Sequence, residues 1–316
     1  MRILFVKTSS LGDVIHQCPA VSDVRRRYPA AGIDWIVEEA FAGIASMHPA
    51  VRRVIPVAVR RWRKRPFAAS TWREALAFWR ALREHRYDFV IDTQGLLKSA
   101  LIAAGARGTR YGFDAASARE PVASRFYNVT HAVRKDMHAV ERNRMLTAAS
   151  LGMYAPSEPC EYGLIPGAAG PATPAKPYCV LLSMTSRADK LWPDGHWVEL
   201  VRAQAARGCE SLLPWGSEVE RIRSARIVAA AGVGVLPERL SLSELAGLIS
   251  EAEVAIGVDT GLTHMAVALG VPAIGIYCAS EPSLTGLHGD TRTVNLGGPG
   301  CVPAVQDVLA ALQALA

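Results

Sequence analysis

The sequence lacks the patterns by which several large enzyme classes hold their cofactors. No Asp-x-Asp pair occurs in its 316 residues, so the paired carboxylates that commonly hold a divalent metal on a nucleotide diphosphate are absent. No Gly-x-Gly-x-x-Gly follows the first strand-like run of either half of the chain. This absence disfavours a dinucleotide-dependent dehydrogenase, and we expect no metal and no other cofactor.

Cysteine is scarce and scattered. The six cysteines are Cys18, Cys160, Cys179, Cys209, Cys278 and Cys301. None forms a Cys-x-x-Cys pair, and several lie inside apolar runs, where a cysteine is usually a small core residue. The pattern excludes a zinc ribbon or a disulfide framework and fits a reducing cytoplasm.

Long apolar runs are also missing. Only a few apolar residues precede Lys7, which is too few for a signal peptide. The most apolar region, 264–280, is interrupted by Gly270 and Pro272, and it is typical of a helix, a turn and a strand rather than a membrane span. The formal charge of +6 and the isoelectric point of about 9.1 are compatible with an anionic partner but do not identify it.

Strand-like and helical patterns alternate along the chain. In the first half, strands are predicted at 2–7, 33–38, 52–59 and 87–93, and helices near 13–28, 70–86, 96–105 and 136–151. In the second half, strands are predicted at 178–184, 210–216, 233–237, 253–258 and 272–277, and helices near 194–207, 218–231, 243–250, 262–269 and 305–316. Repeated βα units of this length predict doubly wound parallel sheets covered on both faces.

A segment rich in Pro, Gly and Ala separates the two halves. We interpret 166–177 as a linker between two Rossmann-like α/β domains, 1–165 and 178–316, with a cleft between them. Open parallel sheets bind ligands at the carboxyl ends of their strands, so chemistry should follow the strands.

Two polar loops follow strands of the second half. Asp259, Thr260, Gly261 and His264 occupy a strand-to-helix turn, where backbone N–H groups and the helix dipole suit a diphosphate. Helix capping is an equally good explanation of that turn alone. The other loop carries hydroxyls and a cation, namely Thr185, Ser186 and Lys190, and alone it would be a solvated loop. Together the two loops favour a nucleotide diphosphate site.

Three further features remain open on the residues alone. Glu220 begins a helix, where a carboxylate is favourable anyway, although it could accept hydrogen bonds from a ribose. The run RRWRKR at 60–65 is a solvated cationic loop, an RNA contact or a receptor for a highly anionic substrate, and we favour the last. Asp13, in the turn KTSSLGDVIH, would repel a phosphate, and helix capping is its ordinary explanation.

Several of these stretches together resemble a known family. In chain order they are KTSSLGDVIH (7–16), RRWRK (60–64), AREP (118–121), DKLWP (189–193), PWG (214–216) and VDTGLTH (258–264). They are similar to the lipopolysaccharide heptosyltransferases of inverting glycosyltransferase family nine, and KTSS-x-GD with RRWRK resembles the type I group. The family implies the two-domain GT-B fold and metal-independent transfer of heptose from ADP-heptose to the inner Kdo sugar of Kdo2-lipid A.

The resemblance also implies roles for residues. Asp13 matches the family's catalytic base, and the first domain would bind the acceptor while the second binds ADP-heptose. Leu240 stands where a relative has methionine beside the adenine. The implied acceptor contacts are Ser9, Ser10, Arg60, Arg63, Lys64, Lys98 and Arg119.

The family's location is the cytoplasmic face of the inner membrane of a Gram-negative bacterium, where the enzyme is peripheral and no nucleic acid partner is expected. Two alternatives stay open. One is a heptosyltransferase of the same family with a different core acceptor, and the other is a non-catalytic basic protein that binds a membrane surface or RNA.

Overall fold

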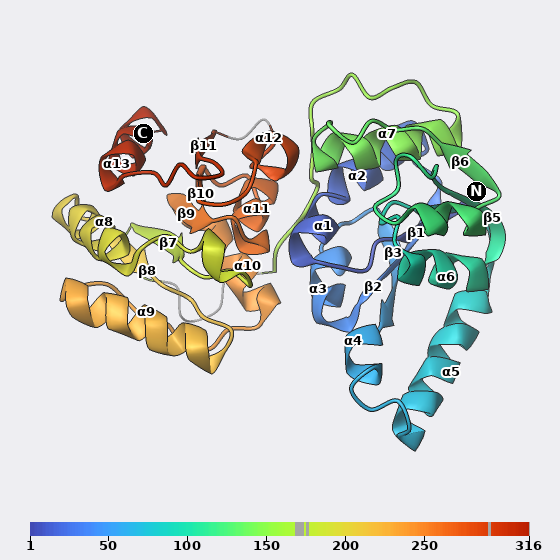
Figure 1. Ribbon diagram of the computed structural model, residues 1–316, viewed down its shortest axis with the longest axis horizontal. Helices are drawn as coiled ribbons and strands as arrows, with labels where there is room; N and C mark the ends of the chain where they lie inside the picture. Colours follow the sequence, from blue (N-terminus) through green and yellow to red (C-terminus); the bar gives the residue numbers. More distant parts are fainter. Residues whose placement is uncertain (168–173, 175–176, 290–291, 316) are drawn as a thin grey trace. The chain divides into compact units, whose positions relative to one another are not determined.

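The chain folds into two compact α/β units, Met1–Leu164 and Ile165–Ala316 (Figure 1). The computed structural model describes residues 1–167, 174, 177–289 and 292–315. Most of the predicted linker, 166–177, lies outside these described residues, so the predicted domain limits stay predictions.

The first unit is built around a six-stranded sheet. Its strands are β1 (Arg2–Val6), β2 (Gly32–Glu38), β3 (Val51–Val57), β4 (Arg86–Asp92), β5 (Arg107–Phe113) and β6 (Val129–His131). Its helices are α1 (Leu11–Ile15), α2 (Cys18–Arg27), η1 (Glu39–Phe41), α3 (Ala42–Ser46), α4 (Val59–Trp62), α5 (Ala69–Arg83), α6 (Leu97–Gly105), η2 (Pro121–Phe126) and α7 (Ala139–Leu151).

Both faces of this sheet are buried, as its apolar strands require. The strands are all parallel in the order β3-β2-β1-β4-β5-β6. Leu4 and Val6 of β1 pack with Phe78 and Leu82 of α5, together with residues of α6. The alternate residues of β1 point to the opposite face, which α2, α3 and α7 cover (Figure 1).

The second unit repeats the plan on a five-stranded sheet. Its strands are β7 (Tyr178–Leu182), β8 (Glu210–Leu212), β9 (Val254–Val258), β10 (Ala273–Tyr277) and β11 (Thr293–Gly297). Its helices are η3 (Ala188–Lys190), α8 (Asp194–Ala206), α9 (Glu218–Ala231), α10 (Leu242–Ser250), α11 (Gly261–Ala268), α12 (Pro282–Thr285) and α13 (Val305–Leu315). The strands are parallel in the order β11-β10-β9-β7-β8.

Gly257 shows how closely α11 approaches the second sheet. A Cβ on this glycine would lie 2.2 Å from the Thr263 hydroxyl oxygen and 2.8 Å from the Leu182 Cβ. Only glycine fits there, because the neighbours are a helix and an adjacent strand. This contact fixes the start of α11 over the carboxyl end of β9.

The structure corrects two predicted elements. The helix predicted at 13–28 is two helices, because Pro19 lies in the first turn of α2 and cannot continue the preceding one. The strand predicted at 233–237 is a single bridge from Val235 to Leu212, and Gly234 there has a φ of +100°. Three strands were missed: β5 and β11 carry polar residues and glycine, and β6 has three residues. Across the described part of the chain, no helix is long and apolar enough to span a bilayer.

A buried ion pair joins α7 to α2, and it generates a stability prediction. Arg144 donates to both carboxylate oxygens of Asp23, at 2.7 and 3.2 Å, and both side chains are buried. Arg144→Met should lower the free energy of unfolding by about 3–5 kcal/mol, because Asp23 would lose its main counter-charge. Urea denaturation of the full chain measures the change.

Arg134→Met is the matched control, since Arg134 pairs with Asp136 on the surface. Exposed pairs contribute little, so its denaturation curve should superimpose on that of the wild type. Equal effects of the two substitutions would contradict a special role for the buried pair.

Candidate functional site

Each sheet reverses its strand order once, and Asp13, Lys190 and Asp259 lie shortly after the strands at those reversals. In the first unit the chain moves from β1 outward to β2 and β3, then returns to place β4 on the other side of β1. In the second unit β7 and β9 are the corresponding neighbours. Connections leave such a point toward opposite faces, which opens a crevice at the carboxyl ends of the two strands.

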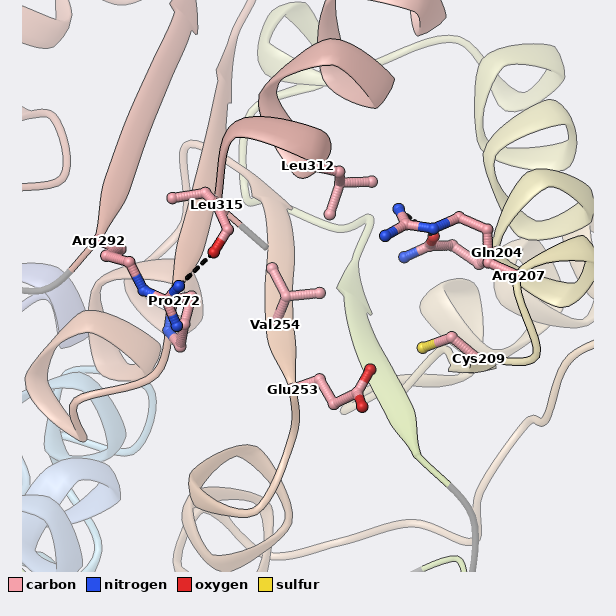
Figure 2. A pocket seen from close by; sticks show the side chains of 9 residues that line it. All are labelled: Gln204, Arg207, Cys209, Glu253, Val254, Pro272, Arg292, Leu312 and Leu315. Carbon is pink, nitrogen blue, oxygen red and sulfur yellow. Dashed lines mark hydrogen bonds between the residues drawn. The ribbon is translucent and has the colours of Figure 1, made fainter.

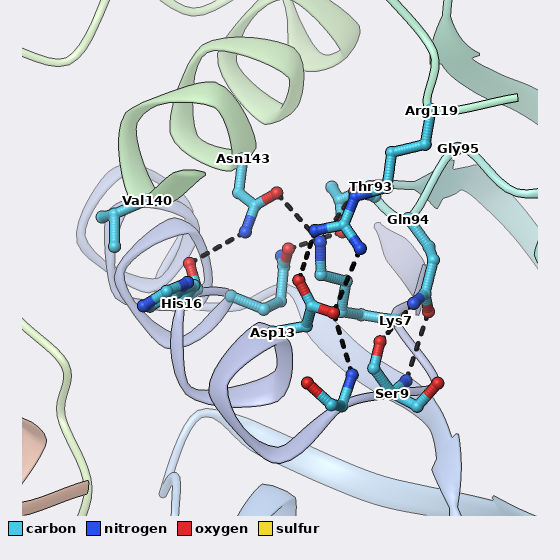
Figure 3. Close-up of polar contacts among 12 residues, drawn as sticks. Lys7, Ser9, Asp13, His16, Thr93, Gln94, Gly95, Arg119, Val140 and Asn143 are labelled. Carbon is cyan, nitrogen blue, oxygen red and sulfur yellow. Dashed lines mark hydrogen bonds and ion pairs between the residues drawn. The ribbon is translucent and has the colours of Figure 1, made fainter. Parts of the chain in front are cut away.

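Asp13 lies beyond the carboxyl end of β1, in the short helix α1 (Figure 3). Arg119 holds its carboxylate with two hydrogen bonds, of 2.6 Å to Oδ1 and 3.2 Å to Oδ2. The backbone N–H of Ser10 donates to Oδ2 at 2.9 Å. The side chain of Asp13 is 13% exposed. The carboxylate therefore caps α1, as its position suggested, and is also fixed by a bidentate arginine.

The charges around Asp13 keep it ionised. Burial has the largest single effect and raises the pKa of Asp13, but Lys7, Arg119 and the Ser10 N–H together lower it below its ordinary value. Burial lowers the pKa of Lys7 to about 8, although Asp13 acts in the opposite direction. Lys7 is held by the Thr93 carbonyl at 2.9 Å and by Asn143 at 3.3 Å.

The loops after β1 and β4 are tied together beside Asp13. Gln94 accepts hydrogen bonds from the backbone N–H of Thr8 at 2.6 Å and of Ser9 at 3.2 Å. Lys98, at the start of α6, donates to the Ser9 hydroxyl at 2.9 Å. The structure thus brings Ser9, Ser10, Lys98 and Arg119 together around Asp13, while their contact with an acceptor stays a prediction.

The cationic loop follows β3 at the same edge of the sheet. Arg60 lies 5.5 Å from the centre of the Phe41 ring, and its backbone N–H donates to Glu38. Burial raises the pKa of Glu38 above its ordinary value, although the hydrogen bond and charge of Arg60 and the charge of Lys98 act in the opposite direction. Arg63 and Lys64 are exposed.

Only part of that loop is available to bind anions. Arg61 is paired with Glu39 at 2.9 Å and with Glu74 at 2.8 Å, so it braces the loop. The guanidinium of Arg63 and the ammonium of Lys64 have no ion-pair partner among the described residues. A surface hollow of about 510 Å³ adjoins Lys64 and Glu38.

The two polar loops of the second unit, predicted separately, meet at one point. Lys190 donates to the Asp259 carboxylate at 2.5 Å, and the Thr185 hydroxyl donates to the Asp259 carbonyl at 3.0 Å. His264 Nε2 lies 3.8 Å from the other carboxylate oxygen of Asp259. Asp259 thus fixes the ammonium group of Lys190 in place.

The Asp259 carboxylate is stabilised as an anion. Burial raises its pKa, but contacts with His264, Lys190 and Ser280 together hold that pKa well below the usual range. Thr260 is the N-cap of α11, and its side chain makes no capping hydrogen bond. Lys190, the Thr185 and Thr260 hydroxyls and the first N–H groups of α11 therefore form a cradle with the chemistry that a diphosphate needs.

Arg223 was missed by sequence reasoning. It lies on α9 and is largely buried, and it donates to the carbonyls of Ser183 and Trp192 and to the Asp194 carboxylate. It thereby holds both ends of the loop that carries Thr185 and Lys190. The sequence gives no signal for this role, because an arginine within a helix looks like surface charge.

The remaining predicted donor residues lie in loops and helix starts of the same unit. Glu220 accepts from the backbone N–H groups of Gly216 at 2.6 Å and Ser217 at 3.1 Å, so it forms a capping box. Ser186 is exposed, and Leu240 lies partly buried shortly before α10. Their predicted contacts with ribose, phosphate and adenine stay predictions.

The second unit also has a cavity of about 400 Å³ (Figure 2). It lies at the amino ends of the strands, whereas the cradle around Lys190 lies at their carboxyl ends. Its lining includes Cys209, Val254 and Pro272, which stand at or just before the starts of β8, β9 and β10. Ligand crevices of parallel sheets open at the carboxyl ends instead. Within the described residues, no cluster of three or more His, Cys, Asp or Glu side chains could hold a metal ion.

Comparison with known proteins identifies the family of the chain. Residues 75–312 match the family model for glycosyltransferase family 9 (heptosyltransferase). Lipopolysaccharide heptosyltransferase 1 of Escherichia coli K12 is 46% identical over 297 residues, covering 93% of each chain. The structure of E. coli heptosyltransferase WaaC with ADP matches with a TM-score of 0.91 and 42% identity, and that with ADP-2-deoxy-2-fluoro heptose matches with 0.89 and 41%; both alignments cover all of each chain.

These matches confirm the expected fold of two doubly wound parallel-sheet α/β units, the GT-B architecture. They also confirm the resemblance drawn from KTSSLGDVIH and VDTGLTH. The chain belongs to glycosyltransferase family 9 and is a heptosyltransferase of lipopolysaccharide core biosynthesis.

Proposed function

We propose that the protein transfers L-glycero-D-manno-heptose from ADP-heptose to the inner Kdo sugar of Kdo2-lipid A, with inversion at the anomeric carbon. The observation that carries the proposal is that the chain contains two distinct sites. One holds a fixed, ionised carboxylate, Asp13, and the other is a cradle around Lys190 that suits a diphosphate. The relatives with ADP and a fluorinated ADP-heptose support this donor class.

In this proposal the second unit binds the donor. The diphosphate of ADP-heptose lies against Lys190, the Thr185 and Ser186 hydroxyls, and the N-terminus of α11 from Thr260 to His264. Its negative charge grows as the anomeric bond breaks, and fixed donors then stabilise it more strongly. Glu220 accepts from the ribose and Leu240 packs on the adenine. No metal is required, because the lysine and the helix dipole supply the positive charge.

Asp13 acts as the base in the first unit. The acceptor hydroxyl oxygen forms a bond to the anomeric carbon while the bond from that carbon to the diphosphate breaks; Asp13 takes the hydroxyl proton and ADP leaves. Each carboxylate oxygen has two lone-pair positions, and among the described residues Oδ1 accepts a hydrogen bond from Arg119 alone. The second position on Oδ1 is therefore available for the hydroxyl.

The low pKa of Asp13 constrains the timing of that proton transfer. A carboxylate whose pKa lies below its ordinary value of 3.8 is a weak base toward an alcohol. The proton therefore moves late, as the hydroxyl oxygen bonds to an oxocarbenium-like carbon and becomes acidic. Positioning of the reactants and stabilisation of the leaving diphosphate then supply most of the catalysis.

The acceptor is strongly anionic, since it bears Kdo carboxylates and lipid A phosphates. Arg60, Arg63 and Lys64 suit such a ligand, because arginine forks bind carboxylates and phosphates with two parallel hydrogen bonds. Ser9, Ser10 and Lys98 lie nearer to Asp13. Arg119 acts mainly by orienting Asp13. We place the enzyme, as a peripheral protein, at the cytoplasmic face of the inner membrane.

A product assay tests the choice of acceptor. Purified protein supplied with ADP-heptose and Kdo2-lipid A should form the singly heptosylated lipid, because its cationic loop faces Kdo and phosphate charges. Mass spectrometry of the product provides the measurement. Product formed only from a core that already carries heptose would assign the protein to a different step of the same pathway.

Replacing Asp13 tests the base. Asp13→Asn keeps the shape of the side chain but removes the charge that accepts the proton, so turnover should fall by about 10²–10⁴-fold while ADP-heptose still binds. On the acid side, the wild-type rate should fall only as the pH drops through the lowered pKa of Asp13, which lies below the ordinary value of 3.8.

Asp136→Asn is the matched control, since Asp136 also pairs with an arginine of the first unit but lies exposed on its surface. It should leave turnover unchanged. Near-normal turnover of Asp13→Asn, with a normal melting temperature, would remove Asp13 from the mechanism.

Replacing Lys190 tests the cradle. Lys190→Met should weaken ADP binding by about 10- to 100-fold, the usual effect of losing a hydrogen bond to a charged group. Calorimetry with ADP measures the loss, and EDTA should leave wild-type turnover unchanged. Arg187→Met, in the same loop but paired with exposed Asp189, is the control and should bind ADP normally. Magnesium-dependent recovery of activity after EDTA treatment would contradict the metal-free account.

A further inference from the structure

The segment 60–84 carries the whole net charge of the protein. It contains eight of the 35 lysines and arginines and two of the 29 acidic residues, so 27 of each sign remain elsewhere. The cations are Arg60, Arg61, Arg63, Lys64, Arg65, Arg73, Arg80 and Arg83, and the carboxylates are Glu74 and Glu84. A formal charge of +6 confined to 25 residues forms a basic patch on an otherwise balanced protein.

The same segment exposes large apolar side chains. Phe67 is 94% exposed, Trp72 67%, Leu76 50% and Trp79 37%. Trp72, Leu76 and Trp79 are spaced i, i+4 and i+7, so they line one face of α5. The other face carries Phe78 and Leu82, which are buried in the core of the unit. α5 is thus apolar on two sides, and only one of them is covered by the protein.

The exposed face of α5 continues onto α6. A Cβ on Gly105 would lie 1.8 Å from the Trp79 ring, so this ring rests on the end of α6. Leu101 and Leu97, four and eight residues before Gly105, lie on the same side of α6 and are 48% and 37% exposed. The start of α5 and the preceding loop form the tip of the first unit (Figure 1). We call Phe67, Trp72, Leu76, Trp79, Leu97 and Leu101 the α5–α6 strip.

We propose that the α5–α6 strip, with the cations around it, docks onto an anionic lipid bilayer. Tryptophan, phenylalanine and leucine beside arginines are the composition of an interfacial helix, whose apolar face enters the acyl boundary while its cations meet lipid phosphates. The docking proposal rests on the proposed function in one respect, namely that the acceptor of that function is anchored in lipid. The exposure of the α5–α6 strip and the positive charge of the segment 60–84 do not depend on it.

Nucleic acid fits this surface less well than lipid does. Nucleic acid binding needs cations and stacking platforms, but it does not need an aliphatic strip such as Leu76, Leu97 and Leu101. A second copy of the chain would bring two patches of like charge together. An anionic bilayer satisfies both the apolar strip and its charge.

Vesicle flotation tests the proposal. The full-length protein should float with phosphatidylglycerol vesicles and much less with phosphatidylcholine vesicles. Trp72→Gln with Leu76→Gln should weaken binding to the anionic vesicles by about 10- to 100-fold, the effect of withdrawing two large apolar side chains from lipid. Phe67→Gln alone is a second variant that cannot disturb the core, and it should weaken binding by a smaller factor.

The control removes apolar side chains from another exposed helix face. Val219→Gln with Ile222→Gln, on α9, alters residues that are 73% and 55% exposed and lie outside the patch. It should float like the wild type. Transfer to a de-acylated, water-soluble acceptor should be equal in all variants. If the wild type floats but transfers heptose to no acceptor, the proposed function fails while the docking surface stands.

Three results would overturn the docking proposal. One is flotation of the Trp72→Gln, Leu76→Gln variant equal to that of the wild type, which would leave only charge attraction. The second is a wild-type dimer that this variant converts to a monomer, which would make a second copy the occupant. The third is RNA binding that the variant abolishes while vesicle binding is undetectable.

Discussion

The reversal of strand order in each sheet is the constraint on which both candidate sites depend. At β1 and β4, and again at β7 and β9, neighbouring parallel strands send their connections to opposite faces. The loops that follow these strands are consequently the ones that meet. In the first unit Gln94 bonds to Thr8 in the loop before Asp13, and Arg119 bonds to Asp13 itself; in the second unit Lys190 bonds to Asp259. The fold brings together side chains that lie about 70 to 110 residues apart along the chain.

Both sites contain an acidic side chain paired with a basic one, but the reactive partner differs. In the mechanism we propose, the carboxylate of Asp13 in the first unit reacts, and Arg119 and Lys7 keep it ionised and oriented. This makes it a weak base, so the pairing favours positioning over basicity. In the second unit Lys190 is the proposed partner of the diphosphate, and Asp259 holds it close to the N-terminus of α11. An unpaired lysine would be more attractive to a diphosphate but less well placed.

The sequence predicts most of the fold because its central strands are short continuous apolar runs, the pattern of a parallel sheet that is buried on both faces. β1, β4, β7, β9 and β10 were all expected within a few residues. β5, with the sequence RGTRYGF, was missed because arginine and glycine interrupt the pattern, and pairing with β4 and β6 supplies its stability. The predicted strand at 233–237 was wrong because periodicity cannot reveal a glycine with positive φ.

Site residues could be predicted where their side chains lie in a loop that follows a strand. They could not be predicted where a distant segment of the chain contributes the side chain. Asp13, Lys190 and Asp259 have such local signals, whereas Arg223 reaches its loop from the middle of α9. The pairing of Arg119 with Asp13 spans 106 residues, and no local pattern reveals it.

The start of α6 links the acceptor site to the proposed docking surface. Lys98 points to Ser9 beside Asp13, and the preceding residue, Leu97, is the end of the α5–α6 strip. Adjacent residues of a helix point about 100° apart, so one turn of α6 faces the site on one side and solvent on the other. A bilayer against the strip would therefore lie within one helical turn of the loop that holds Asp13. A sugar on a lipid headgroup lies at the surface of the bilayer. Its charged groups would then be close to the cations of residues 60–65. The basic segment 60–84 and the α5–α6 strip thus belong to the same unit as Asp13, the proposed base.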